Sequence, residues 1–163
     1  MQQRAAGLCL VIGCLLLAGV EPASAQDVTV SASYDILYHQ FEETTAVGVH
    51  FDAARSFGLL AGVGEIGFNR LEQSTVVSFA GGGRYMIPHS ASARLQPAVQ
   101  VLLGIWHCGP CDVNEVFVQP GFLVDIPRSD TFRIRAQFDV RRIFFDFGGE
   151  NAQRLSFGGV WSF

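Results

Sequence analysis

The chain has 163 residues, of which 49% are hydrophobic and only 16% are charged, and this length favours one domain, with or without a leader. Disordered chains combine low hydrophobicity with high charge, so the composition argues against disorder. All 11 cationic residues are arginine, and 15 acidic residues outnumber them, which gives a net charge of −4. That balance argues against a nucleic-acid partner. What remains is an apolar domain rich in glycine and phenylalanine, with 18 and 14 residues respectively.

The start of the chain has the three parts of a secretory signal peptide. Residues 1–4 include one arginine, residues 5–20 are almost wholly apolar, and Ala23-Ser24-Ala25 is the small-x-small pattern of a cleavage site. We therefore predict a signal peptide over residues 1–25, cleaved after Ala25, and a mature domain over residues 26–163.

Two other interpretations of the leader are weaker. The apolar run is rather short for a transmembrane anchor. Residues 11–14 resemble a lipoprotein cleavage box, but cutting there leaves the apolar residues 15–20 on the mature chain and the Ala-Ser-Ala site unused.

Period-2 alternation recurs along the mature chain, which shows no convincing helical stretch. Turn-forming residues separate eight runs, so we expect strands at residues 28–38, 44–53, 57–68, 75–87, 93–106, 115–126, 131–144 and 153–163. Eight consecutive strands with short connections indicate an up-and-down antiparallel barrel. Their lengths suit the roughly 9–11 residues that a tilted strand needs to cross a bilayer.

The seventh expected strand shows the alternation most clearly. Its apolar face comprises Phe132, Ile134, Ala136, Phe138 and Val140. Its other face carries four charges and one amide, from Arg133, Arg135, Gln137, Asp139 and Arg141. Four charges on one face need solvent or partners. A soluble, lipocalin-like barrel would turn the apolar face inward, whereas a membrane barrel turns it toward lipid.

The polar faces mix charges of both signs, which favours the membrane barrel. The interior of an eight-stranded barrel is just filled by side chains, so we expect a paired charge network in the lumen and no open pore. The expected arginines are Arg84, Arg94, Arg133, Arg135, Arg141 and Arg154. The expected carboxylates are Asp35, Asp52, Glu65, Asp125 and Asp139.

Glycine and aromatic positions support the same choice. Glycines recur inside the expected strands, at residues 58–67 and 81–83, where they permit the bending that a small closed barrel needs. Aromatic residues near the strand ends predict two interfacial girdles. One girdle is expected to hold Tyr34, Tyr38, Phe41, Trp106, Phe144, Phe145 and Phe147. The other is expected to hold Phe57, Tyr85, Phe132, Trp161 and Phe163.

The last strand carries the most specific motif. Ser156, Gly158, Trp161 and Phe163 form a polar-x-Gly-x-x-aromatic-x-aromatic pattern. With this motif and the alternation over residues 27–163, the chain resembles the small bacterial outer-membrane β-barrels of the OmpA/OmpX type. The resemblance implies an eight-stranded antiparallel up-and-down transmembrane β-barrel in the outer membrane of a diderm bacterium.

The resemblance also implies partners and topology. Outer-membrane lipid would surround the barrel, and the barrel-assembly machinery would recognise the last strand. Both termini would be periplasmic, and the outward loops would lie near residues 39–43, 69–74, 107–114 and 145–152.

The Cys-Gly-Pro-Cys segment that starts at Cys108 nearly matches the active site of thioredoxin. That chemistry needs a thiolate at a helix N-terminus and a βαβ context, whereas the residues that follow Cys111 continue as a strand. We interpret the pair as a disulfide that closes the third outward loop. A zinc site with His107 and Asp112 is disfavoured, because tetrahedral zinc usually draws ligands from two separated elements.

The sequence thus predicts a non-enzymatic outer-membrane barrel with a structural or surface-recognition role, and with no cofactor, metal or catalytic residue. Three alternatives stay open: a small-solute pore, a soluble lipocalin-like binder, and a thiol–disulfide oxidoreductase that uses Cys108. The sequence names no external ligand.

Overall fold

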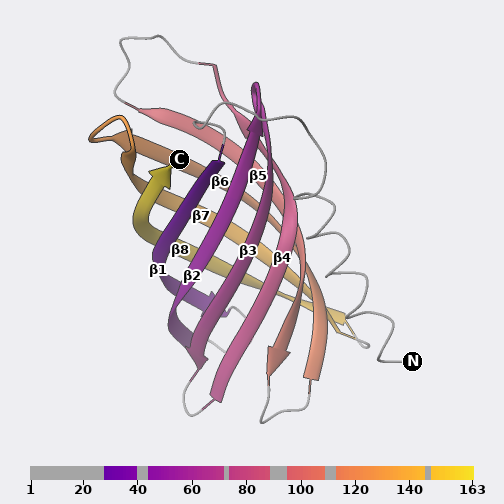
Figure 1. The fold of residues 1–163 in the computed structure, drawn as a ribbon. Helices are drawn as coiled ribbons and strands as arrows, with labels where there is room; N and C mark the ends of the chain where they lie inside the picture. Colours follow the sequence, from indigo (N-terminus) through magenta and orange to yellow (C-terminus); the bar gives the residue numbers. More distant parts are fainter. Residues whose placement is uncertain (1–27, 40–43, 72–73, 89–94, 109–112, 146–147) are drawn as a thin grey trace.

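A closed barrel of eight strands is formed by the residues that the computed structural model describes, which are 28–39, 44–71, 74–88, 95–108, 113–145 and 148–163. The strands are β1 (Val28–His39), β2 (Thr44–Phe57), β3 (Leu60–Leu71), β4 (Ser74–Met86), β5 (Gln96–Cys108), β6 (Val113–Pro127), β7 (Phe132–Phe145) and β8 (Gly148–Ser162). Each strand pairs with the next in antiparallel register, and β8 pairs with β1 (Figure 1). The predicted fold is confirmed. None of the described residues belongs to a helix long and apolar enough to cross a membrane.

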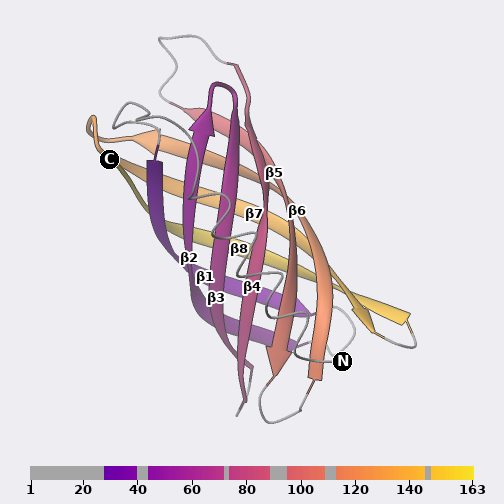
Figure 2. The same cartoon turned by 45° about the vertical axis from the view of Figure 1, so that its right-hand side comes forward.

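The barrel has two ends with different connections. The proximal end, as we name it, holds Val28 and Ser162 and the connections 58–59, 87–95 and 128–131; the distal end holds the other four connections. The strands are steeply tilted, so those of the front and back walls cross in projection (Figure 2). No distal connection spans more than four residues between its strands.

The first proximal turn lies later in the chain than the sequence predicts. We expected a turn over residues 54–56, but β2 continues to Phe57 and the chain reverses at Gly58 and Leu59. Gly58 has a φ of +70°, which glycine adopts without steric cost. Two-residue hairpin turns favour glycine for this reason, whereas residues 54–56 contain none. The expected strand 57–68 is therefore wrong by three residues at each end.

Other strand ends also differ from the expectation. β8 begins at Gly148 and β6 at Val113, five and two residues before the expected starts, so the expected outward loop over residues 145–152 is mostly strand. β5 begins at Gln96, three residues late, and runs on to Cys108. Pairing with the neighbouring strand accounts for the early starts of β8 and β6, because Gly148 pairs with Phe145 of β7 and Val113 pairs with Cys108 of β5.

Apolar and polar side chains alternate between the outer wall and the lumen. On β7, Ile134 and Phe138 are 38% and 44% exposed, whereas Arg135 and Asp139 are 2% and 0% exposed. Val140 is also exposed, and Phe132 is half-buried at the start of the strand. A lipocalin-like binder requires these apolar side chains to point inward, so their direction argues against that alternative.

The aromatic residues follow the girdle expectation only in part. Exposed aromatic side chains lie near the distal end of the outer wall, at Tyr38 and Phe144, and near its proximal end, at Phe57, Tyr85, Trp161 and Phe163. Phe145 is exposed at the distal end of β7, but it shares the inward parity of Arg141 and Ile143. The girdle expectation for Trp106 is wrong, because its side chain is buried inside the barrel among the residues of a hydrophobic cluster. The expectation for Tyr34 is also wrong, since this residue is exposed near the middle of β1. Phe41 and Phe147 lie outside the described residues.

Candidate functional site in the barrel lumen

Ten charged side chains meet inside the barrel. They are Arg84, Arg133, Arg135, Arg141, Arg154, Asp35, Asp52, Glu65, Asp125 and Asp139. Nine of them are at most 6% exposed, and Arg133 is half-buried near the proximal end. Five cations face five anions, so this set is neutral as a whole. Arg94, the remaining expected arginine, lies outside the described residues.

Arg154 of β8 is the centre of one half of this network. Its Nη1 and Nη2 donate to the two carboxylate oxygens of Glu65, at 2.7 and 2.8 Å, across the lumen on β3. Its Nε donates to the carboxylate of Asp139, on the neighbouring strand β7, at 2.9 Å. Asp35 of β1 lies 3.8 Å from the same guanidinium. One buried cation therefore holds three carboxylates together.

Arg135 of β7 is the centre of the other half. Its Nε and Nη2 donate to the two carboxylate oxygens of Asp125, at 2.7 and 2.9 Å, and its Nη1 donates to Asp52 at 3.1 Å. Asp52 also accepts from the Nη2 of Arg84 at 3.3 Å and from the hydroxyl of Ser31. Bidentate pairs of this kind are among the stronger hydrogen bonds in proteins.

Strand register explains why the network must reach across the lumen. Asp52 and Glu65 lie directly opposite each other on β2 and β3, and like charges in such positions repel. Arginines from the far wall separate them, since Arg135 binds the first and Arg154 the second. Two opposite-charge pairs, by contrast, are built into the register of neighbouring strands: Asp125 with Arg135, and Asp139 with Arg154.

Apolar side chains fill the distal part of the lumen. We call the buried cluster of Val76, Trp106, Cys108, Phe117 and Ile143 the distal plug. Arg141 joins it to the charge network, because its guanidinium lies over the Phe117 ring, 4.2 Å from the centroid, and is 3.9 Å from Glu65. A cation over an aromatic face is stabilised most where water is excluded.

Gly121 of β6 makes room for the network. It lies opposite Asp139 in register and points inward, and a Cβ atom at this position would overlap the Asp139 carboxylate. Gly64 of β3 is its natural control, because a Cβ there would meet nothing within 4 Å. The two glycines therefore have different physical roles in one barrel.

We expect Gly121→Ala to lower the free energy of unfolding by about 1–3 kcal/mol, the usual cost of overpacking. Gly64→Ala should not lower it. Urea unfolding of the two variants and of the wild-type barrel, refolded in lipid vesicles, measures the difference. Equal stability of the two variants would contradict the packing role of Gly121.

The other predicted site residues lie apart from this network. Cys108 is buried at the distal end of β5, in a strand and not at a helix N-terminus. Cys111 and Ala25 lie outside the described residues, so the disulfide and the cleavage site stay predictions. On β8, the side chain of Ser156 is buried, whereas Trp161 and the adjoining Phe163 are exposed on the outer wall.

Sequence reasoning missed several partners of the charged residues. His50 lies with its Nδ1 2.7 Å from Asp35, and Gln100 accepts from Arg84 at 3.0 Å while donating to Asp139 at 3.3 Å. His50 and Gln100 lie an even number of residues from inward-facing charged residues of their own or neighbouring strands, so strand alternation predicts that both point into the lumen. Within the described part of the chain, no group of histidine, cysteine and carboxylate side chains is arranged to hold a metal ion.

Among known proteins, only solved structures match this chain. No protein-family model and no curated protein sequence matches the chain. The Neisserial surface protein A, NspA, matches with a TM-score of 0.68 and 11% identity, over 83% of this chain and 96% of that one. The N-terminal β-barrel domain of OprF from Pseudomonas aeruginosa matches with a TM-score of 0.60 and 12% identity, over 85% and 98%.

A third solved structure is similar in the same way. Ail, the attachment invasion locus protein of Yersinia pestis, matches with a TM-score of 0.53 and 8% identity, over 83% of this chain and 96% of that one. The chain has the fold of the small outer-membrane β-barrels. At these identities the likeness concerns the fold alone.

Proposed function

We propose that the protein is an integral outer-membrane β-barrel of a diderm bacterium, non-enzymatic, with a filled polar lumen. Its role is structural, or recognition at the cell surface. The observation that carries the proposal is the sorting of side chains, with charges buried inside and apolar residues exposed outside. A barrel in water gains nothing from exposing phenylalanine and leucine on its wall, whereas a barrel in lipid requires it.

The contacts across the lumen support the proposal that it is filled. Arg154 joins β8 to β3, and Arg135 joins β7 to β2, so ion pairs bridge opposite walls. The distal plug lies beyond them along the barrel axis. Opening a path for ions would require breaking buried charge pairs, which costs several kcal/mol for each one broken.

Conductance in a planar bilayer tests the filled lumen. We expect the purified barrel to give almost no conductance steps, under conditions in which a general porin added to the same bilayer conducts. Regular steps from this protein would contradict the proposal and support the small-solute pore instead.

The short distal connections limit the surface that a binding partner could contact. If the termini are periplasmic, the distal end faces outward and presents strand ends and connections of at most four residues. A partner would then contact the rim of the barrel. This geometry favours a structural role over binding by long loops.

The remaining expectations complete the proposal. Residues 1–25 are removed as a signal peptide, the assembly machinery recognises β8 through Trp161 and Phe163, and Cys108 pairs with Cys111. Mass spectrometry of the protein from the outer membrane, before and after reduction, tests two of these points. A mature N-terminus other than Gln26 would contradict cleavage after Ala25, and two free thiols would contradict the disulfide.

A further inference from the structure

We propose that a groove on the outer wall binds a phosphate-bearing membrane lipid, with an acyl chain along the groove and the phosphate on Arg70. This inference rests on the proposed membrane location. It is carried by the shape of the wall across β1 to β4 and by the position of Arg70, which has no partner among the described residues.

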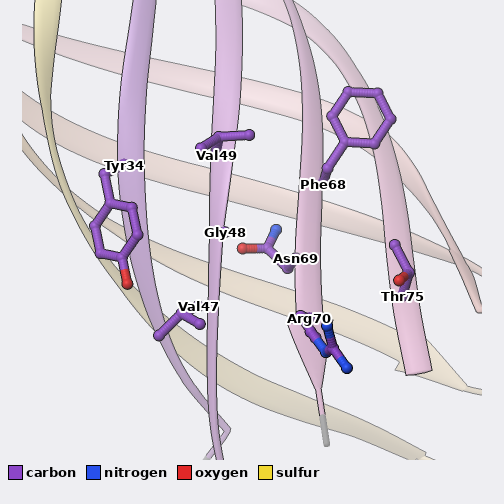
Figure 3. A pocket seen from close by; sticks show the side chains of 8 residues that line it. All are labelled: Tyr34, Val47, Gly48, Val49, Phe68, Asn69, Arg70 and Thr75. Carbon is purple, nitrogen blue, oxygen red and sulfur yellow. The ribbon is translucent and has the colours of Figure 1, made fainter. Parts of the chain in front are cut away.

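The groove comes from large and small side chains in neighbouring strands. Tyr34 of β1 lies opposite Val49 of β2, and Val49 lies opposite Phe68 of β3. The smaller valines on β2 thus form a trough between two aromatic walls, with a volume of about 300 Å³ (Figure 3). Its lining is apolar along the strands, which suits a hydrocarbon chain.

Arg70 ends the groove on the distal side. It lies opposite Val47 and Thr75 in register, and both of these residues also line the groove. Its side chain is exposed on the outer wall, and it makes no hydrogen bond or ion pair with another described residue. Its guanidinium carries five donors and a fixed positive charge, and a phosphate group would satisfy these in a bidentate contact.

The distribution of charges between the two faces of the strands supports an anionic ligand on the outer wall. The charged side chains that point outward from the described strands are all arginines, namely Arg55, Arg70 and Arg142, and the carboxylates of these strands take inward positions. Arg55 lies over the Phe57 ring, and Arg142 donates to Asn151. Of these three arginines, Arg70 is the one that lines the groove and that makes neither a ring contact nor a hydrogen bond with another described residue. Arginines near a membrane surface attract anionic headgroups.

Lipid binding to the refolded barrel in detergent tests the proposal by native mass spectrometry. The probe is phosphatidylglycerol, compared with diacylglycerol of the same acyl chains and with inorganic phosphate. We expect phosphatidylglycerol to bind, the two partial ligands to bind far more weakly, and Arg70→Gln to weaken phosphatidylglycerol binding about tenfold, because a charge-assisted contact is lost. Val47→Trp, which fills the groove, should weaken it as well.

Arg128→Gln, in the exposed proximal turn at residues 128–131, is the matched charge control and should bind like the wild type. Unchanged binding in Arg70→Gln, or equal binding of diacylglycerol, would overturn the lipid site. Equal binding of inorganic phosphate would replace it with a free-phosphate site. Heat-modifiable migration on gels confirms that each variant is folded, and a wild-type chain without it would contradict the proposed function itself.

Discussion

Replacing Arg154 with methionine is expected to lower the free energy of unfolding by about 3–5 kcal/mol, the cost of leaving buried charges unpaired. Arg154 binds Glu65 and Asp139 and lies near Asp35. Methionine fills a similar volume but leaves three carboxylates close together without their common cation. Urea unfolding in lipid vesicles, followed by tryptophan fluorescence, measures the loss.

A double-mutant cycle separates the ion pair from general damage to the barrel. Glu65→Gln removes one of the unpaired charges, so we expect the double variant to lose less stability than the sum of the two single variants. Arg128→Met, at an exposed position, should change stability little. Strict additivity of Arg154→Met and Glu65→Gln would show that the two side chains do not stabilise each other.

Phe138→Arg is expected to cost about 2–4 kcal/mol, because it places a charge on the lipid face near the bilayer midplane. Phe138 is 44% exposed in the middle of β7. The same substitution at Phe144, which is similarly exposed near the distal end of that strand, should cost only about 0–1 kcal/mol.

Depth is the variable that this pair of substitutions tests. The two phenylalanines share one strand and one face, so a difference between them reports the lipid and not the barrel. Unfolding of both variants in vesicles measures it. Equal and small costs would contradict a lipid-facing wall, since water solvates an arginine equally well at either position.

The sequence predicted the faces of the strands better than their ends. Strict alternation in β7 placed Arg135 and Asp139 on one polar face, the mixed charges favoured the lumen for that face, and both residues are buried. The same parity also places Trp106 inward, with Gln100, but its position at a strand end favoured a girdle. Strand parity is the stronger signal for an aromatic residue, because the pleat fixes the direction of its side chain.

The partners within the lumen could not be predicted from one sequence. The mixed charges of the polar faces predicted that Arg154 and Glu65 both face the lumen. Their contact depends on the tilt and closure of the barrel, which bring β8 and β3 together across the lumen. The turn at Gly58 was within reach of sequence reasoning, because glycine marks a two-residue hairpin. The early start of β8 was not, since its pairing with β7 extends the strand through polar residues.

Membrane fractionation combined with heat-modifiable migration on gels tests the central claim most directly. The full chain, expressed in a diderm bacterium, is predicted to sediment with the outer membrane, to resist extraction by carbonate, and to migrate faster when unheated than when boiled. A chain recovered in the soluble fraction, with the same migration before and after boiling, would contradict the account.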